Sequence, residues 1–115
     1  MMRRGDIVLV DLDPVRGNET SKSRPAVIVS NDGANRKADQ LGRGVITIVP
    51  ITSNTERVFP FQVLLEDVPG LRVVSKAQAE QVRSVSVERV GPALGRLPVS
   101  LIAELDRALR LHLSL

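Results

Sequence analysis

Short runs of β-branched and other apolar residues, separated by glycine, proline and polar residues, predict a mainly β protein. The runs predict strands at residues 4–11, 26–30, 44–51 and 61–65. Residues 71–77 and 79–85 predict either one long strand or two strands joined by a kink, and a last short edge strand is expected around Pro92. Several short strands with turns between them favour a small barrel or a twisted sheet over a parallel α/β fold.

From Pro98 onward the apolar residues follow helical spacing, at positions 101, 102, 105, 108 and 109. Proline is tolerated in a first helical turn, and Arg107 and Arg110 suit the negative C-terminal end of a helix. The pattern therefore predicts a C-terminal helix whose apolar stripe packs on the sheet. A shorter helix of one or two turns is expected within residues 34–41.

Residues 12–23 are rich in turn-forming residues and predict a long loop. The loop carries Arg16 and Lys22, two basic residues that suit an anionic ligand. The strand that follows, residues 26–30, is apolar on both faces and is therefore expected in the centre of the sheet.

The chain has 115 residues, which predicts a single domain spanning residues 1–115 with one modest core. Hydrophobic residues make up 43% and charged residues 25%, as in ordinary globular proteins. The chain has no cysteine, which excludes a disulfide framework and a thiolate zinc site. Near its start only residues 7–10 are consecutively apolar, too few for a signal peptide or a membrane span, so we expect a cytoplasmic protein.

The net charge is +3 and the isoelectric point is about 10.2, values that favour an acidic partner such as a nucleic acid. Most of the basic residues are arginines. An excess of arginine suits forked contacts to phosphate, and it is equally typical of a GC-rich genome. The charge alone does not decide between a nucleic-acid partner and the effect of a GC-rich genome.

Polar groups cluster at three strand ends. Arg24 precedes Pro25, and because proline holds the residue before it in extended geometry, Arg24 is presented at the mouth of an apolar strand. The polar segment 52–54 follows another apolar run, and the segment 81–84 lies within a third. Guanidinium, hydroxyl and amide groups without a nearby histidine predict a surface that binds a phosphodiester.

Four segments, in this order, resemble the MazF/PemK toxins of bacterial toxin-antitoxin pairs. They are Arg-Gly-Asp-Ile at 4–7, Arg-Pro-Ala-Val-Ile-Val-Ser at 24–30, Pro-Ile-Thr-Ser-Asn at 50–54 and Glu-Gln-Val-Arg-Ser at 80–84. The resemblance implies an SH3-like β-barrel with added helices. It also implies a homodimeric toxin that cuts single-stranded RNA at a short sequence without the ribosome and is neutralised by an acidic antitoxin.

The resemblance implies Arg24 and Thr52 as the catalytic pair. RNA can be cut without metal because its own 2′-OH attacks the adjacent phosphorus, and the enzyme then orients the attack and stabilises the developing charge. The guanidinium of Arg24 suits charge stabilisation, and the hydroxyl of Thr52 can donate to the same phosphate. Each residue taken separately has a simpler interpretation. Arg24 would form an ion pair with Asp6 or Asp11, and residues 52–54 would form a plain turn.

Contacts to the rest of the RNA are expected from Lys22, Ser53, Asn54, Gln81 and Arg83. Gln81 and Arg83 alternate with Val82, which predicts that they project from one face of a strand while Val82 faces the core. Without the resemblance, the sequence favours Gln81 and Arg83 as ordinary solvent-facing residues. The family usually carries an acidic residue three positions after this arginine, where this chain has Ser86.

No cofactor and no metal are expected, since Asp11 and Asp13 lack companions at ligand spacing. The general base and acid stay unassigned: arginine is a poor base, and His112, the single histidine, is expected to be a packed or helix-end residue. The alternatives are a gyrase poison of the CcdB type and an SH3-like peptide-binding module. The chain lacks the tryptophan of the first and the aromatic groove of the second.

Overall fold

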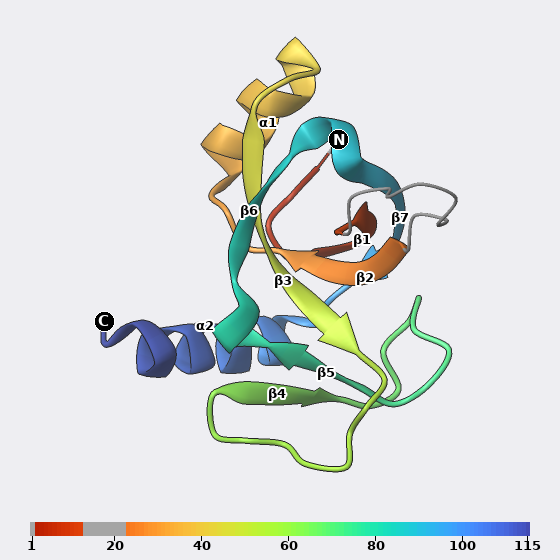
Figure 1. The fold of residues 1–115 in the computed structure, drawn as a ribbon, viewed down its shortest axis with the longest axis vertical. Coiled ribbons are helices and arrows are strands. Elements are labelled where there is room, and N and C mark those ends of the chain that lie inside the picture. Colours follow the sequence, from red (N-terminus) through yellow and green to blue (C-terminus); the bar gives the residue numbers. More distant parts are fainter. Residues whose placement is uncertain (1, 13–22) are drawn as a thin grey trace, which may run out of the picture.

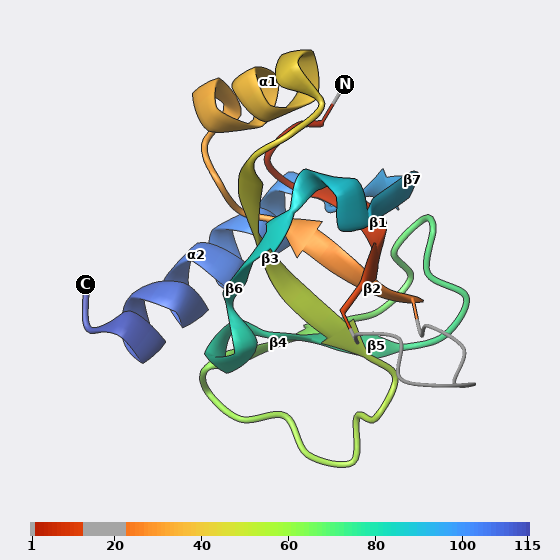
Figure 2. The ribbon, with the colours of Figure 1, turned by 45° about the horizontal axis from the view of Figure 1, so that its top comes forward.

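A curved antiparallel sheet forms the body of the protein, and two helices pack against it (Figures 1 and 2). The structure is a computed structural model that describes residues 2–12 and 23–115. The strands are β1 (Asp6–Asp11), β2 (Ser23–Ile28), β3 (Val45–Thr52), β4 (Gln62–Leu65), β5 (Ser75–Gln78), β6 (Arg83–Ser86) and β7 (Val90–Arg96). The helices are α1 (Asp32–Leu41) and α2 (Val99–Leu113), with 3₁₀ turns η1 (Ala79–Gln81) and η2 (Val87–Arg89).

Strand β3 is the longest strand and organises the sheet. The strand order is β4-β5-β3-β2-β1-β7, and β6 also pairs with β3. One edge of β3 pairs with β2, while its other edge pairs first with β6 and then, through its last two residues, with β5. The predicted fold class, mainly β with an SH3-like barrel and a C-terminal helix, is confirmed.

The central strands β1, β2 and β3 bury side chains on both faces. One core, on the side of α2, contains Ile7, Val27 and Val49 together with Leu105 of the helix. The other core contains Val8, Ala26, Ile28, Ile46 and Ile48 with Ala38 of α1. Neighbouring residues of each strand thus serve opposite cores, because side chains alternate along a strand. The predicted central position of residues 26–30 is confirmed for β2.

Capping residues mark both ends of helix α1. The side chain of Asn31 accepts a hydrogen bond from the Ala34 backbone N–H at 2.8 Å, and α1 ends at Gly42 in left-handed conformation. Helix α1 has ten residues, more than the one or two turns expected. The predicted C-terminal helix is confirmed, with Leu105 and Ala108 buried. No helix within residues 2–12 and 23–115 has the length and hydropathy of a membrane span.

Three sequence expectations are corrected. Strand β2 begins at Ser23, so Arg24 lies within the strand, where it pairs with Val10 of β1. The strand expected from residue 71 begins only at Ser75. Residues 79–81 form the turn η1, closed by a hydrogen bond from the Val82 N–H to the Ala79 carbonyl at 3.1 Å. The expectation that Gln81 and Arg83 project from one face of one strand is therefore wrong.

Candidate functional site

A pocket of about 630 Å³ opens where the ends of β2 and β3 meet the connection between β4 and β5. We call this connection, residues 66–74, the 66–74 loop. The volume is typical of small-ligand sites. The described residues that line the pocket are Leu9, Arg24, Pro25, Ile51, Thr52, Ser53, Gly70, Leu71, Arg72, Val73, Ser75 and Leu94.

Arg24 and Thr52 come together through the pairing of β2 with β3. The ladder ends with the pair Ala26 and Pro50, and Arg24 and Thr52 each lie two residues beyond this pair. Both line the pocket, and Arg24 is exposed. Within the described residues Arg24 forms no ion pair, and Asp6 binds Arg96 at 3.0 Å. The side chain of Arg24 is thus available to a ligand.

The hydroxyl of Thr52 is oriented by the backbone that follows it. Its Oγ1 accepts a hydrogen bond from the Asn54 N–H at 3.2 Å, and the side chain of Asn54 accepts one from the Glu56 N–H at 3.3 Å. Residues 52–56 therefore form side-chain-stabilised turns, as the simpler reading proposed. Because Oγ1 accepts from the backbone, its hydrogen is left to donate toward the pocket.

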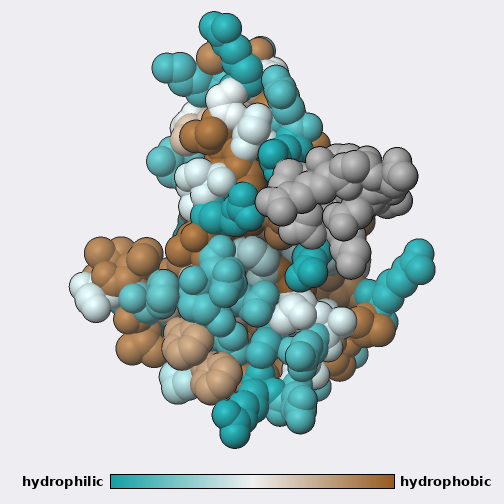
Figure 3. All heavy atoms as spheres, viewed as in Figure 1, coloured by the Kyte–Doolittle hydropathy of each residue, from teal (hydrophilic) through white to brown (hydrophobic). Residues whose placement is uncertain are grey.

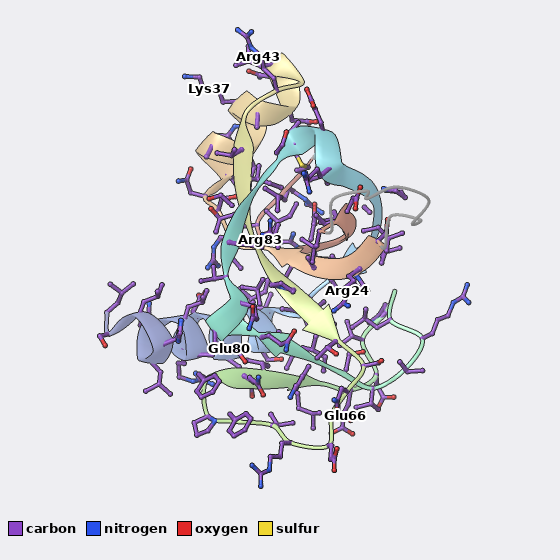
Figure 4. All side chains as sticks on the ribbon, in the orientation of Figure 1. Arg24, Lys37, Arg43, Glu66, Glu80 and Arg83 are labelled. Atoms are coloured by element: carbon purple, nitrogen blue, oxygen red, sulfur yellow. The ribbon has the colours of Figure 1, made fainter. Side chains whose placement is uncertain are left out.

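The other predicted contact residues are distributed over several elements, and Figure 4 labels Arg83 among them. Ser53 lines the pocket, and Asn54 is exposed beside it. Gln81 is exposed in η1, and Arg83 opens β6 on the far side of β3 from Arg24. Arg83 pairs with Ile48, four residues along β3 from Thr52, which is roughly 13 Å at the rise of a strand. Neither Gln81 nor Arg83 lines the pocket, and Lys22 lies outside the described residues.

Two buried polar side chains hold the loop that follows Thr52. Lys76, paired with Thr52 across β3 and β5, donates from Nζ to the Arg57 carbonyl at 2.5 Å. Gln62 accepts from the Phe59 N–H at 3.1 Å and donates to Glu80 at 2.5 Å. The ring of Phe59 stacks on the ring of Phe61, with 5.3 Å between the ring centroids. These contacts tie the loop to β4, β5 and η1.

The face that carries Arg83 is mostly hydrophilic along β3 and β6, whereas apolar side chains gather at the C-terminal end of α2 (Figure 3). Leu111, Leu113 and Leu115 are exposed there. His112 belongs to the same last turn, exposed and 6.4 Å from the Phe61 ring, so its prediction as a helix-end residue is confirmed.

The described residues that line the pocket supply cations and hydroxyls. They include Arg24, Arg72, Thr52, Ser53 and Ser75, and no histidine, lysine or carboxylate is among them. No group of three or more potential metal ligands occurs within residues 2–12 and 23–115. Such a set of side chains binds an anion and stabilises negative charge.

Sequence reasoning missed the contribution of the 66–74 loop to this pocket. Arg72 and Leu71 were assigned to a strand because they begin an apolar, β-branched run. Pro69-Gly70 is a turn signal, but nothing local in the sequence shows that the chain stays irregular for four residues after it.

Comparison with known proteins decides the family. The sequence model of the family described as PemK-like, MazF-like toxin of type II toxin-antitoxin system matches residues 3–113. The chain belongs to this family. Endoribonuclease MazF9 of Mycobacterium tuberculosis is 59% identical over 116 residues, which cover all of this chain and 98% of the relative. Endoribonuclease MazF of Staphylococcus epidermidis is 33% identical over 117 residues, covering all of this chain and 93% of the relative.

Solved structures of this family share the fold. MazF in a MazE–MazF crystal structure from Deinococcus radiodurans superposes with a TM-score of 0.80 at 26% identity, over 99% of this chain and 96% of that one. A mycobacterial endoribonuclease in complex with its cognate antitoxin gives 0.79 at 23% identity, over 100% and 97% of the two chains. The matches do not favour the gyrase-poison alternative, and the family inferred from four short segments is confirmed.

Proposed function

We propose that this protein is the toxin of a type II toxin-antitoxin system, a sequence-specific endoribonuclease that cuts single-stranded messenger or other cellular RNA in the cytoplasm. It acts without metal, cofactor or ribosome. The observation that carries the proposal is that Arg24 and Thr52, at neighbouring ends of β2 and β3, line one pocket. Membership of a family with relatives named endoribonucleases supports it.

In the proposed reaction the 2′-oxygen of the RNA forms a bond to the adjacent phosphorus. The bond from phosphorus to the 5′-oxygen breaks, the 2′-OH loses its proton and the 5′-oxygen gains one. The products are a cyclic phosphate and a 5′-OH. Arg24 binds the non-bridging oxygens through its planar guanidinium, and Thr52 donates its free hydroxyl hydrogen to the same phosphate. Ser53 and Asn54 contact the nucleotides beside it, and Lys22, Gln81 and Arg83 hold flanking parts of the strand.

The partners we propose are a second copy of the chain and an antitoxin of the MazE type. The net charge of +3 and the exposed arginines favour an acidic segment that folds on binding. Relatives support this, since a Deinococcus radiodurans structure holds MazE with MazF and a mycobacterial one holds an endoribonuclease with its antitoxin. A homodimer would extend the RNA groove across two copies.

The test is to incubate the purified protein, in EDTA, with a long unstructured RNA and to map the cut sites and their end groups. The same RNA with a 2′-deoxy sugar at each mapped site is the second substrate. We expect cutting that leaves a 5′-OH on the first substrate and none on the second. Cutting of the deoxy substrate, or no cutting by folded protein, would refute the proposed reaction.

Variants assign the roles. Replacing Arg24 with Ala, or Thr52 with Val, is expected to lower kcat by about 10²–10³ each, the loss typical of one donor to a developing oxyanion. Arg24→Lys keeps the charge and loses the fork, so it is expected to restore part of the activity. Arg43→Ala, a change of an exposed arginine that lies far from Arg24 in Figure 4, is the matched control and should cut like the unmodified protein.

A further inference from the structure

The pocket has a second cation that the catalytic pair does not use. Arg72, in the 66–74 loop, lines the pocket together with Arg24 and Thr52. It is exposed and forms no ion pair with any described residue. Arg72 therefore offers a second guanidinium group to an anionic ligand of this pocket.

Arg72 projects from a segment that is held in place rather than from an unsupported surface loop. Val68 is buried, and Leu71 packs against the core and donates its N–H to the Val68 carbonyl at 3.1 Å. Gly70 lies so close to β7 that a Cβ there would overlap the Leu94 carbonyl. The backbone of Arg72 is therefore placed before any ligand arrives, which lowers the entropy cost of binding.

Most of the other residues that line the pocket are apolar. Leu9, Pro25, Leu71 and Leu94 line it, with hydroxyl groups of Thr52 and Ser53 beside Arg24. A nucleotide has this combination of chemistry, because an apolar base face lies between two charged phosphates.

We propose that this pocket seats one nucleotide of the single-stranded RNA and that Arg72 binds a phosphate adjacent to the one held by Arg24 and Thr52. The base lies against the apolar wall, and Arg72 sets which part of the strand reaches the catalytic pair. Arg72 is thus a binding residue that does not touch the reacting phosphate. The inference rests on the proposed function, because the ligand is the RNA that is cut.

The test measures binding without cutting. A fluorescent RNA with one mapped cut site, protected there by a 2′-deoxy sugar, is titrated with the unmodified protein and with the Ala variants of Arg72 and Arg43 at several salt concentrations. Arg72→Ala is expected to weaken binding roughly tenfold and to reduce the slope of log K against log salt by about 0.7, the value for one phosphate contact to a single strand. Arg43→Ala should change neither quantity.

Neutral methylphosphonates, placed one at a time along the same RNA, locate the contact. For the unmodified protein, we expect RNA affinity to fall when one phosphate adjacent to the cut site is neutralised. For Arg72→Ala, neutralising the same phosphate should cause no further loss of affinity, as in a double-mutant cycle. On cuttable RNA the variant should raise KM and leave kcat unchanged. Equal losses at that position in both proteins, or an unchanged salt slope, would overturn the inference.

Two further measurements distinguish a phosphate contact of Arg72 from a role in assembly. Light scattering on both proteins shows whether Arg72→Ala alters the oligomeric mass, and a change would assign the 66–74 loop to an interface between copies and overturn the inference. The proposed function fails if the unmodified protein neither binds nor cuts RNA. The assignment of Arg72 alone fails if the unmodified protein does both and Arg72→Ala equals the control.

Discussion

A few glycines allow the backbone contacts that shape the pocket. Gly70 has a φ of +98°, which favours glycine, and a Cβ there would overlap the Leu94 carbonyl of β7. Gly95, the next residue of that strand, approaches the Pro69 carbonyl as closely. The 66–74 loop therefore packs backbone against backbone on β7. At the residue scale, the pocket wall formed by the 66–74 loop depends on glycine, which has no side chain, at positions 70 and 95.

We predict that Gly70→Ala lowers the free energy of unfolding by about 2–4 kcal/mol, because it adds steric overlap with a backbone to the cost of a positive φ. Gly42→Ala is the matched control, since Gly42 also has a positive φ, +63°, but has nothing within 4 Å of the added Cβ. Urea unfolding of both variants checks this. Equal losses for the two would mean that the contact with β7 contributes nothing.

Helix α1 is attached to the sheet through its first turn. Asp32 accepts a hydrogen bond from the Arg4 backbone N–H at 2.7 Å, and Asn35, fully buried, donates to the Ser30 carbonyl at 2.9 Å. The hydrogen bond from Arg4 holds the pKa of Asp32 below its usual 3.8, and nearby Asn35 and Arg36 act in the same direction. At the element scale, a charged carboxylate joins the start of α1 to the residues that precede β1.

Because the folded pKa of Asp32 is lowered, its carboxylate contributes stability that is present above about pH 3.8 and is lost as the pH falls through the folded pKa. We predict that Asp32→Asn lowers the thermal midpoint at pH 7 and that this difference from the unmodified protein shrinks toward pH 3. Asp39→Asn, at an exposed position of the same helix, is the control. A difference that stays constant from pH 7 to pH 3 would contradict the assignment. Calorimetry across this pH range checks it.

The two cores are joined by the strands they share. Each of β1, β2 and β3 contributes residues to both, so neither core can lose its strands while the other keeps them. Helix α2 completes one core with Leu105 and Ala108, and α1 completes the other with Ala38. At the scale of the whole molecule, this arrangement supports the prediction that residues 1–115 form a single domain.

We predict that Leu105→Ala, a deletion in the core under α2, lowers the free energy of unfolding by about 2–5 kcal/mol. Amide hydrogen exchange should then lose protection in β6 and α1 as well as in α2, because all of them open in one cooperative transition. Leu111→Ala, at a position of the same helix that is 57% exposed, is the control and should have little effect. Protection that falls only in α2 would instead indicate two separate units.

Local sequence patterns were sufficient to predict an element wherever a single hydrophobic pattern runs through the segment. The helical spacing after Pro98 predicted α2, and the apolar runs predicted β3 and the central position of β2, because a run that is apolar on both faces of a strand must be covered on both sides. Arg24 and Thr52 were proposed as a pair from short segments that resemble a family, and the structure places them beside one pocket. Their roles in cutting RNA stay predictions.

What the sequence by itself determined is the class of fold, the order of its main elements and the family. Only the tertiary structure decided that the 66–74 loop forms a wall of the pocket and that Arg72 lines it together with Arg24. It also placed Gln81 in the turn η1 and Arg83 in β6, because β3 pairs with β6 along one half and with β5 at its end. These features depend on contacts between segments far apart in the chain, which leave no periodic signal in either segment alone.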